Sequence, residues 1–182
     1  MHATEFERIG RRLFAEHLVG GNFGNLSVRE GDGFFIKRTG EYLDVLHEPV
    51  FVPLEGPVPP DASSEYRVHR EVYKKTPHRA IVHAHPPAAI AASLVLERIV
   101  PEDSEGLMFC PVIPVVDGAP GSDEVARTVS DGLIGGRLVI ARGHGTFAAG
   151  KTLDEAYLLT SLAEHSCRVL MYKAGFAGSV HE

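Results

Sequence analysis

Two histidines separated by one residue are the strongest chemical feature of this sequence. His83-Ala84-His85 close an apolar run that begins at Ala80, and such a run is typical of a buried β-strand. Side chains alternate between the two faces of a strand, so both imidazole rings project from the same face, about 6 to 7 Å apart at the backbone. Two neutral imidazoles placed in this way can bind one metal ion.

A third histidine follows another apolar segment. His144 lies between Gly143 and Gly145, directly after the predicted strand 137–141. Glycine permits a tight backbone turn, which can bring the ring into a cleft. Three imidazoles suit Zn²⁺ with one coordination position left for water or substrate. The alternative is that these histidines are an accidental feature of polar strand ends.

Glu65 is the carboxylate that we expect near this metal. It follows Ser63 and Ser64, and the three residues open a predicted helix that carries Val72 and Tyr73 on one side. The serines are candidate N-caps, and the N–H groups of such a helix start can bind a phosphate. The structural alternative for Glu65 is that a carboxylate in the first helical turn is favoured by the helix dipole alone.

Two further loops are rich in groups that bind anions. One is Gly20-Gly21-Asn22-Phe23-Gly24-Asn25 and the other is Lys37-Arg38-Thr39-Gly40. Neither has the spacing of a Walker A loop, and each alone is typical of a turn. Together with the serines they can form an anion pocket from three converging loops. Lys37 and Arg38 either add positive charge to this pocket or form a solvated strand end.

The elements that must position these groups can be read from the hydrophobic pattern. The pattern predicts five helices: over 6–18 with a stop at Gly20-Gly21, from 63 through 73, from 87, over 122–133 and from 152 to about 175. It predicts strands near 26–28, 34–36, 50–52, 80–85, 112–116 and 137–141. This order lacks a regular βαβ rhythm. We therefore predict an α/β protein of the α+β type, with a central, mainly antiparallel sheet flanked by helices.

Composition limits the class of protein. The 182 residues, 44% hydrophobic and 23% charged, predict one folded domain over 1–182. A formal net charge of -6 makes a nucleic-acid partner unexpected.

The first residues lack a secretory signal, which predicts a cytoplasmic protein. The longest apolar run, 88–96, is too short to span a membrane. Cys110 and Cys167 are expected to be reduced core thiols.

Five of these motifs, in this order along the chain, resemble the class II aldolase/adducin family. They are Gly24-Asn25-Leu26-Ser27-Val28-Arg29, Thr39-Gly40, Ser63-Ser64-Glu65 with Tyr66-Arg67-Val68-His69, His83-Ala84-His85 and Gly143-His144-Gly145. Five separated matches in one order are more specific than any single motif, and they cover most of the chain. The resemblance implies a three-layer fold with a central antiparallel sheet, which agrees with the predicted elements.

The resemblance also implies a site, an assembly and an activity. It implies one Zn²⁺ per subunit, held by His83, His85 and His144, with Glu65 as a further ligand and as the catalytic proton carrier. The implied phosphate pocket consists of Asn22, Asn25, Thr39, Gly40, Ser63 and Ser64. Members usually form homotetramers with active sites at subunit boundaries. The implied activity is that of a lyase that reversibly cleaves a ketose 1-phosphate, such as L-fuculose 1-phosphate, to dihydroxyacetone phosphate and an aldehyde such as L-lactaldehyde.

Other activities within the family stay open as alternatives. The pentulose-phosphate 4-epimerases usually carry Asp at the position of Glu65, so the glutamate favours an aldolase. The methylthioribulose-1-phosphate dehydratases also carry Glu there and are the main alternative. A non-catalytic, adducin-like assembly protein is disfavoured because all three histidines are present. The sequence departs from the sugar aldolases after the short Ala-rich helix, where the acidic pair Glu102-Asp103 replaces an expected tyrosine.

Overall fold

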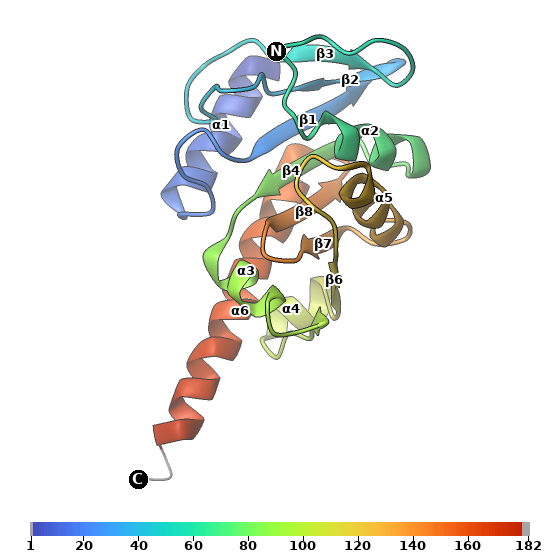
Figure 1. The fold of residues 1–182 in the computed structure, drawn as a ribbon. Helices are drawn as coiled ribbons and strands as arrows, with labels where there is room; N and C mark the ends of the chain where they lie inside the picture. Colours follow the sequence, from blue (N-terminus) through green and yellow to red (C-terminus); the bar gives the residue numbers. More distant parts are fainter. Residues whose placement is uncertain (1, 180–182) are drawn as a thin grey trace.

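The chain folds around one sheet of eight strands, described over residues 2–179 in a computed structural model (Figure 1). The strand order is β3-β2-β1-β4-β8-β7-β6-β5. The strands are β1 (Asn25–Glu30), β2 (Gly33–Ile36), β3 (Val50–Pro53), β4 (Ala80–Ala84), β5 (Arg98–Ile99), β6 (Ile113–Val116), β7 (Leu138–Ala141) and β8 (Gly145–Gly150). All neighbouring strands are antiparallel except β6 and β7. The predicted mainly antiparallel sheet is therefore confirmed. Residues 1 and 180–182 of the predicted domain lie outside the described residues.

Helices cover both faces of the sheet. They are α1 (His2–Ala15), α2 (Tyr66–Lys75), α3 (Pro87–Ser93), α4 (Ser104–Phe109), α5 (Asp123–Gly132) and α6 (Leu153–Ser179). One core cluster joins the sheet to α1, α3 and α6, and a second joins it to α2 and α5. Because the strand β4 lies between the two clusters, all five of its residues are buried. The three-layer arrangement is the predicted one. The C-terminal half of α6 extends beyond the sheet (Figure 1).

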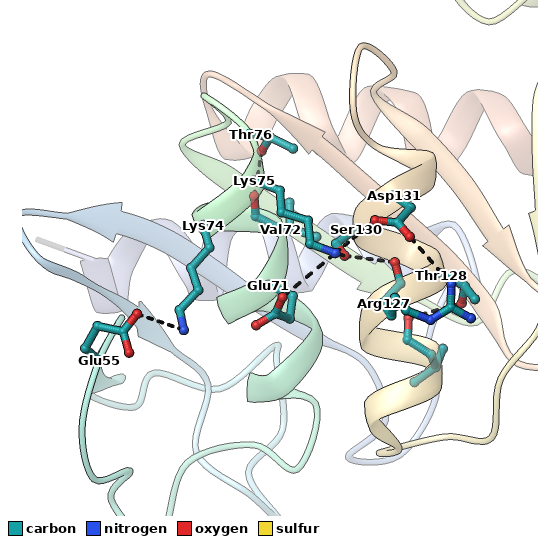
Figure 2. A network of polar contacts seen from close by, with 11 residues as sticks. Glu55, Glu71, Val72, Lys74, Lys75, Thr76, Arg127, Thr128, Ser130 and Asp131 are labelled. Carbon is teal, nitrogen blue, oxygen red and sulfur yellow. Dashed lines mark hydrogen bonds and ion pairs between the residues drawn. The ribbon is translucent and has the colours of Figure 1, made fainter.

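The pair α2 and α5 matters for the site because Glu65 immediately precedes α2. Figure 2 shows the polar contacts between these helices, in which Lys75 Nζ lies 2.9 Å from both Ser130 Oγ and an oxygen of Asp131. Exposed ion pairs contribute little to stability individually. The fully buried Val72 and Val129, which belong to one core cluster, supply the apolar contact beneath them.

The first helix ends earlier than its pattern predicts. It stops at Ala15 rather than continuing through Leu18 to the two glycines. His17 adopts a left-handed φ of 57°, and the N–H of Leu18 donates to the carbonyl of Leu13 at 2.9 Å. This is a helix-closing motif in which the left-handed residue is usually glycine. Because His17 takes that position here, the glycines at 20 and 21 that predicted the stop lie a few residues after the true end of the helix.

The start of α2 also differs from the prediction. The N-cap position is taken by Glu65, whose side chain makes no capping hydrogen bond, and the two serines lie before it. The carbonyl of Ser63 accepts a hydrogen bond from the N–H of Tyr66 at 2.9 Å, which closes a turn in front of the helix. The serines are thus loop residues rather than N-caps. At the other end of the chain, α6 continues past the predicted stop at Gly175 to Ser179.

Three elements have no counterpart in the predicted set. They are the short strand β5, the single-turn helix α4 and the strand β8. β8 has the sequence Gly-Thr-Phe-Ala-Ala-Gly and is buried at every position. Small residues buried on both faces give no alternation for a sequence pattern to detect. None of the described helices has the length and apolar character needed to cross a bilayer. Cys110 and Cys167 are buried free thiols, as predicted.

Candidate active site

The fold brings the three predicted metal-binding histidines together at one end of β4. His83 pairs across the sheet with Asn25 of β1 and with Phe147 of β8. The centroid of its ring lies 4.8 Å from that of His85 and 4.7 Å from that of His144, and the last two are 5.2 Å apart. One ligand nitrogen from each of the three lies within 4.8 Å of the others. The histidine cluster predicted from three separate positions in the sequence therefore exists in space.

The two glycines that flank His144 allow the turn that places its ring in the cluster. Gly143 has a φ of +66°, in the left-handed region that favours glycine. A Cβ atom on Gly145 would lie 2.2 Å from the carbonyl oxygen of Ala84, because β8 approaches β4 closely at this point. The turn between β7 and β8 can therefore reach the end of β4 only with small residues on both sides of the histidine.

The hydrogen bonds and burial of the histidines leave them neutral. The carbonyl of Thr146 can only accept, so His83 Nδ1 carries the proton of their 2.9 Å hydrogen bond and Nε2 keeps a lone pair. Burial lowers the pKa of His83 well below its usual value, that of His85 to about 4, and that of His144. Neutral imidazole is the form that binds a metal ion.

The geometry fits a divalent metal ion. The Nε2 atoms of His83 and His85 are 3.0 Å apart, close to the roughly 3.3 Å between two ligands of a tetrahedral zinc ion with Zn–N bonds of about 2.0 Å. His144 Nδ1 is buried and has no hydrogen-bond partner among the described residues. A buried polar atom without a partner is costly unless something else satisfies it. The donor set is that of a three-histidine site with an open position.

Glu65 lies in the same cavity with one oxygen held and one oxygen free. Its Oε1 accepts a hydrogen bond from the N–H of Gly121 at 3.0 Å, while Oε2 is buried and has no partner among the described residues. Burial raises the pKa of this carboxyl, and the hydrogen bond from Gly121 opposes part of that rise. Sequence patterns do not identify Gly121, because its partner lies 56 positions earlier in the chain.

The predicted phosphate loops converge beside the histidines. Residues 37–40 run antiparallel to 61–64: the N–H of Ser63 donates to the carbonyl of Lys37 at 3.1 Å, and that of Thr39 to the carbonyl of Asp61 at 2.9 Å. The Asn22 side chain reaches the carbonyl of Gly40 at 3.5 Å. A cavity of about 210 Å³ is lined by the histidines, Glu65 and all six predicted phosphate-pocket residues, namely Asn22, Asn25, Thr39, Gly40, Ser63 and Ser64.

The two neighbouring cations of the second loop separate. The side chain of Lys37 is buried and lines the cavity. Arg38 turns outward, where its guanidinium pairs with Asp61 and donates to the carbonyl of Glu48 at 2.9 Å. Lys37 therefore lies where it could add positive charge to the cavity, whereas Arg38 lies at the outer side of the strand end.

A larger groove of about 570 Å³ lies elsewhere on the molecule. It runs along α4 and α6, where Phe109, Leu158 and His165 are among its lining residues. None of the predicted metal or phosphate residues belongs to it. Although Glu105, Glu155 and His165 also line this groove, the described residues that could hold a metal ion together are His83, His85 and His144, so we place the chemistry in the smaller, polar cavity.

Comparison with known proteins agrees with this site. The sequence profile of the class II aldolase and adducin N-terminal domain matches residues 4–171. The crystal structure of L-fuculose-1-phosphate aldolase from Thermus thermophilus superposes with a TM-score of 0.94, at 39% identity over 97% of this chain and 95% of that one. L-fuculose phosphate aldolase from Methanococcus maripaludis is 32% identical over 169 residues, which are 90% of this chain and 93% of the relative.

One further relative carries a different substrate in its name. The 5-methylthioribulose-1-phosphate/5-deoxyribulose-1-phosphate aldolase of Rhodospirillum rubrum is 32% identical over 162 residues, 82% of this chain and 73% of the relative. The matches span nearly the whole described fold and bear out the resemblance seen in the five motifs. On this profile match and these identities, the chain belongs to the class II aldolase/adducin family.

Proposed function

We propose that this protein is a Zn²⁺-dependent aldolase that reversibly cleaves a ketose 1-phosphate, such as L-fuculose 1-phosphate, to dihydroxyacetone phosphate and an aldehyde such as L-lactaldehyde. The observation that carries the proposal is that the three histidines, Glu65 and the phosphate loops line one cavity. The names of the relatives support a class II aldolase, which is a lyase.

The histidines supply the metal site. His83, His85 and His144 would hold one Zn²⁺ per subunit. Glu65 is not part of that group of neighbouring ligand atoms, but it lines the same cavity and would be the further ligand. When bound, the ion supplies a Lewis acid that stabilises the negative charge developing on the ketose oxygens as the C3–C4 bond breaks. Burial keeps the imidazoles neutral, so they require no proton loss before they bind the ion.

Glu65 carries the proton. In the cleavage direction the hydroxyl on C4 loses its proton to solvent as the C3–C4 bond breaks and C4 becomes the aldehyde carbon, and the carboxyl of Glu65 gives a proton to C3, which keeps the electron pair of the broken bond. In the reverse direction Glu65 removes the proton from C3. Oε2 is free for this transfer because Gly121 holds only Oε1. A raised pKa favours the proton-carrying state on which reprotonation of the carbon depends.

The three loops orient the substrate. The cavity that the histidines line is also lined by six polar or glycine residues of these loops, namely Asn22, Asn25, Thr39, Gly40, Ser63 and Ser64. Hydrogen bonds from these groups to a phosphate would hold the reacting carbon near Glu65 without taking part in the chemistry.

A coupled assay for release of dihydroxyacetone phosphate tests the proposal. Chelator-treated protein is given L-fuculose 1-phosphate and related ketose 1-phosphates, with and without added Zn²⁺. Release that returns only with the ion establishes aldolase chemistry and ranks the aldehydes. The panel includes 5-methylthioribulose 1-phosphate, because one relative is named for it. Loss of water from this compound without carbon–carbon cleavage would establish the dehydratase instead, and no turnover of any compound would favour a non-catalytic, adducin-like protein.

The proposal includes the expected assembly and location. We expect a homotetramer with sites at subunit boundaries, one class II aldolase/adducin-like domain over 1–182, and a cytoplasmic location. Exposed apolar side chains on the protruding part of α6 support the assembly: Tyr172 is 58% and Phe176 74% exposed. Exposed apolar surface of this kind is typical of a protein interface.

A further inference from the structure

Phe147 is the one large side chain in a strand of small residues. β8 has the sequence Gly-Thr-Phe-Ala-Ala-Gly and is buried at every position. Its register with β4 places Phe147 directly opposite His83. Opposite residues of an antiparallel pair project from the same face of the sheet, so their side chains are neighbours. The only bulky side chain of β8 therefore lies against one of the three clustered histidines.

The Phe147 ring lies flat against the imidazole of His83. The two ring centroids are 4.0 Å apart, and the ring planes differ by 12°. The same ring meets His144 edge-on, at a centroid distance of 6.0 Å and an interplanar angle of 73°. Aromatic pairs favour such stacked and edge-on arrangements. One fully buried phenyl ring thus packs against two of the three histidines.

The stacking adds a constraint that the hydrogen bond of His83 does not supply. The carbonyl of Thr146 holds Nδ1, which fixes the tautomer and one edge of the imidazole. The torsion about the Cβ–Cγ bond of histidine has broad energy minima, so this bond alone leaves the ring able to tilt. The flat face of Phe147 restricts that tilt, and the lone pair on Nε2 then keeps one direction.

The Phe147 ring is itself held from the side of α2. His69 meets it edge-on at a centroid distance of 6.5 Å, and His69 Nδ1 lies 2.6 Å from Ser27 Oγ of β1. All three residues are fully buried. Because protein interiors are close-packed, a ring enclosed in this way keeps its orientation. Phe147 can therefore act as a fixed support for His83.

We propose that Phe147 is a positioning residue for the metal site, and that its ring holds the imidazole of His83 ready to bind a divalent cation. Ligands that are already oriented bind more tightly, because less conformational freedom is lost on binding. This inference rests on the proposed function, since it takes the three histidines to be metal ligands. In this role Phe147 acts through His83 and takes no part in the chemistry.

The test compares two phenylalanines of one core cluster. Phe147→Leu removes the flat ring and keeps an apolar side chain. Phe34→Leu is the matched control, because Phe34 is also fully buried and belongs to the same cluster. The Phe34 ring pairs with His69 and Tyr73 rather than with a metal ligand. Both variants lose the same volume, so a general loss of core packing affects them alike.

Two properties of the metal-loaded protein are measured after chelator treatment. Competition with a chelator gives the dissociation constant for Zn²⁺, and the visible absorption spectrum of bound Co²⁺ reports the geometry of the ligands. We expect the Zn²⁺ dissociation constant to rise by about tenfold or more in Phe147→Leu and to stay within about twofold of the wild type in Phe34→Leu. The Co²⁺ spectrum should change only in Phe147→Leu. If circular dichroism shows that this variant is unfolded, Phe147→Met takes its place, since methionine adapts to an irregular space.

The outcomes distinguish this inference from the proposed function. If a folded Phe147 variant binds both ions as the wild type does, or if Phe34→Leu weakens binding equally, the inference is wrong, whatever the protein catalyses. If metal affinity depends on Phe147 but no ketose 1-phosphate is cleaved, the inference holds and the proposed function fails. A wild-type protein that binds neither ion would overturn the metal site and this inference together.

Discussion

Glu65 is the residue on which the proposed reaction depends most. Its Oε1 is fixed by Gly121, its Oε2 is buried without a partner among the described residues, and its pKa is raised. Held groups with perturbed pKa values are typical of catalytic acids and bases. A carboxylate that only stabilised the start of α2 would instead bond to the N–H groups of the helix, and the Glu65 side chain makes no such capping bond.

Replacing Glu65 by glutamine should therefore remove turnover and leave binding intact. The amide oxygen of glutamine can still accept from Gly121, but the amide cannot carry a proton to carbon. We expect kcat for aldol cleavage to fall by about 10²- to 10⁴-fold, with the affinity for inorganic phosphate unchanged. The control is Glu71→Gln in α2, whose carboxylate pairs with Lys75 and does not line the cavity. A Glu65→Gln enzyme with wild-type kcat would falsify the proton-transfer role.

The histidine cluster allows an equally direct test at residue scale. His83→Ala removes the most buried imidazole of the three, and we expect the zinc content measured by inductively coupled plasma mass spectrometry to fall from about one per chain to near zero. His78→Ala is the control, because that ring is hydrogen-bonded to the Gly136 carbonyl and does not line the cavity. Finding one zinc per chain in folded His83→Ala protein would show that the ligand set is wrong.

At the scale of elements, the sequence anticipates the parts of the site that depend on local pattern. The strand that ends in His83 and His85 is predictable because apolar residues precede them, and His144 because glycines flank it. What escapes prediction is contact at long range. The hydrogen bond to Glu65 comes from Gly121, and the opposite directions of Lys37 and Arg38 depend on the neighbouring segment 61–64. A local sequence pattern cannot predict these contacts, because the contacting residues lie far apart in the sequence.

The elements also differ in how well they can be predicted from the sequence. β8 is built largely from small residues and is buried on both faces, so neither alternation nor β-branched content indicates a strand. The two serines before α2 have the residue type of an N-cap but lie in a turn, because Glu65 occupies the N-cap position. Residue type at a helix start is thus informative about the region and less so about the exact position.

The turn between β7 and β8 gives a prediction for an element. Gly145→Ala would place a Cβ 2.2 Å from the carbonyl oxygen of Ala84, so β8 must move away from β4. We expect a loss of about 1 to 3 kcal/mol in the free energy of unfolding together with weaker zinc binding, because His144 moves with the turn. Gly20→Ala is the matched control, since its Cβ would meet nothing within 4 Å. Urea denaturation and zinc titration of both variants measure the two effects, and unchanged values for Gly145→Ala would contradict the close-approach argument.

At the scale of the whole molecule, the cavity and the apolar surface are separate. The residues that line the cavity come from the end of β4, the turn between β7 and β8, and the loops that precede β1, follow β2 and precede α2. None of them lines the apolar groove, and the protruding half of α6 lies away from the end of β4 (Figure 1). A subunit contact formed by the protruding half of α6 alone would therefore lie away from the cavity, so the expected position of the sites at subunit boundaries requires a further contact surface.

The protruding part of α6 makes the proposed assembly testable without damage to the core. Tyr172 and Phe176 are one helical turn apart, so they lie on one face of the helix. If this face joins subunits, the double variant Tyr172→Glu/Phe176→Glu should lower the mass measured by light scattering from about four chains towards one, because two buried carboxylates would oppose each interface. Ala174→Glu, on another face of the same helix, should leave the mass unchanged. A wild-type protein that stays at the mass of one chain at micromolar concentration would exclude the tetramer, and an unchanged mass in the double variant would place the interface elsewhere.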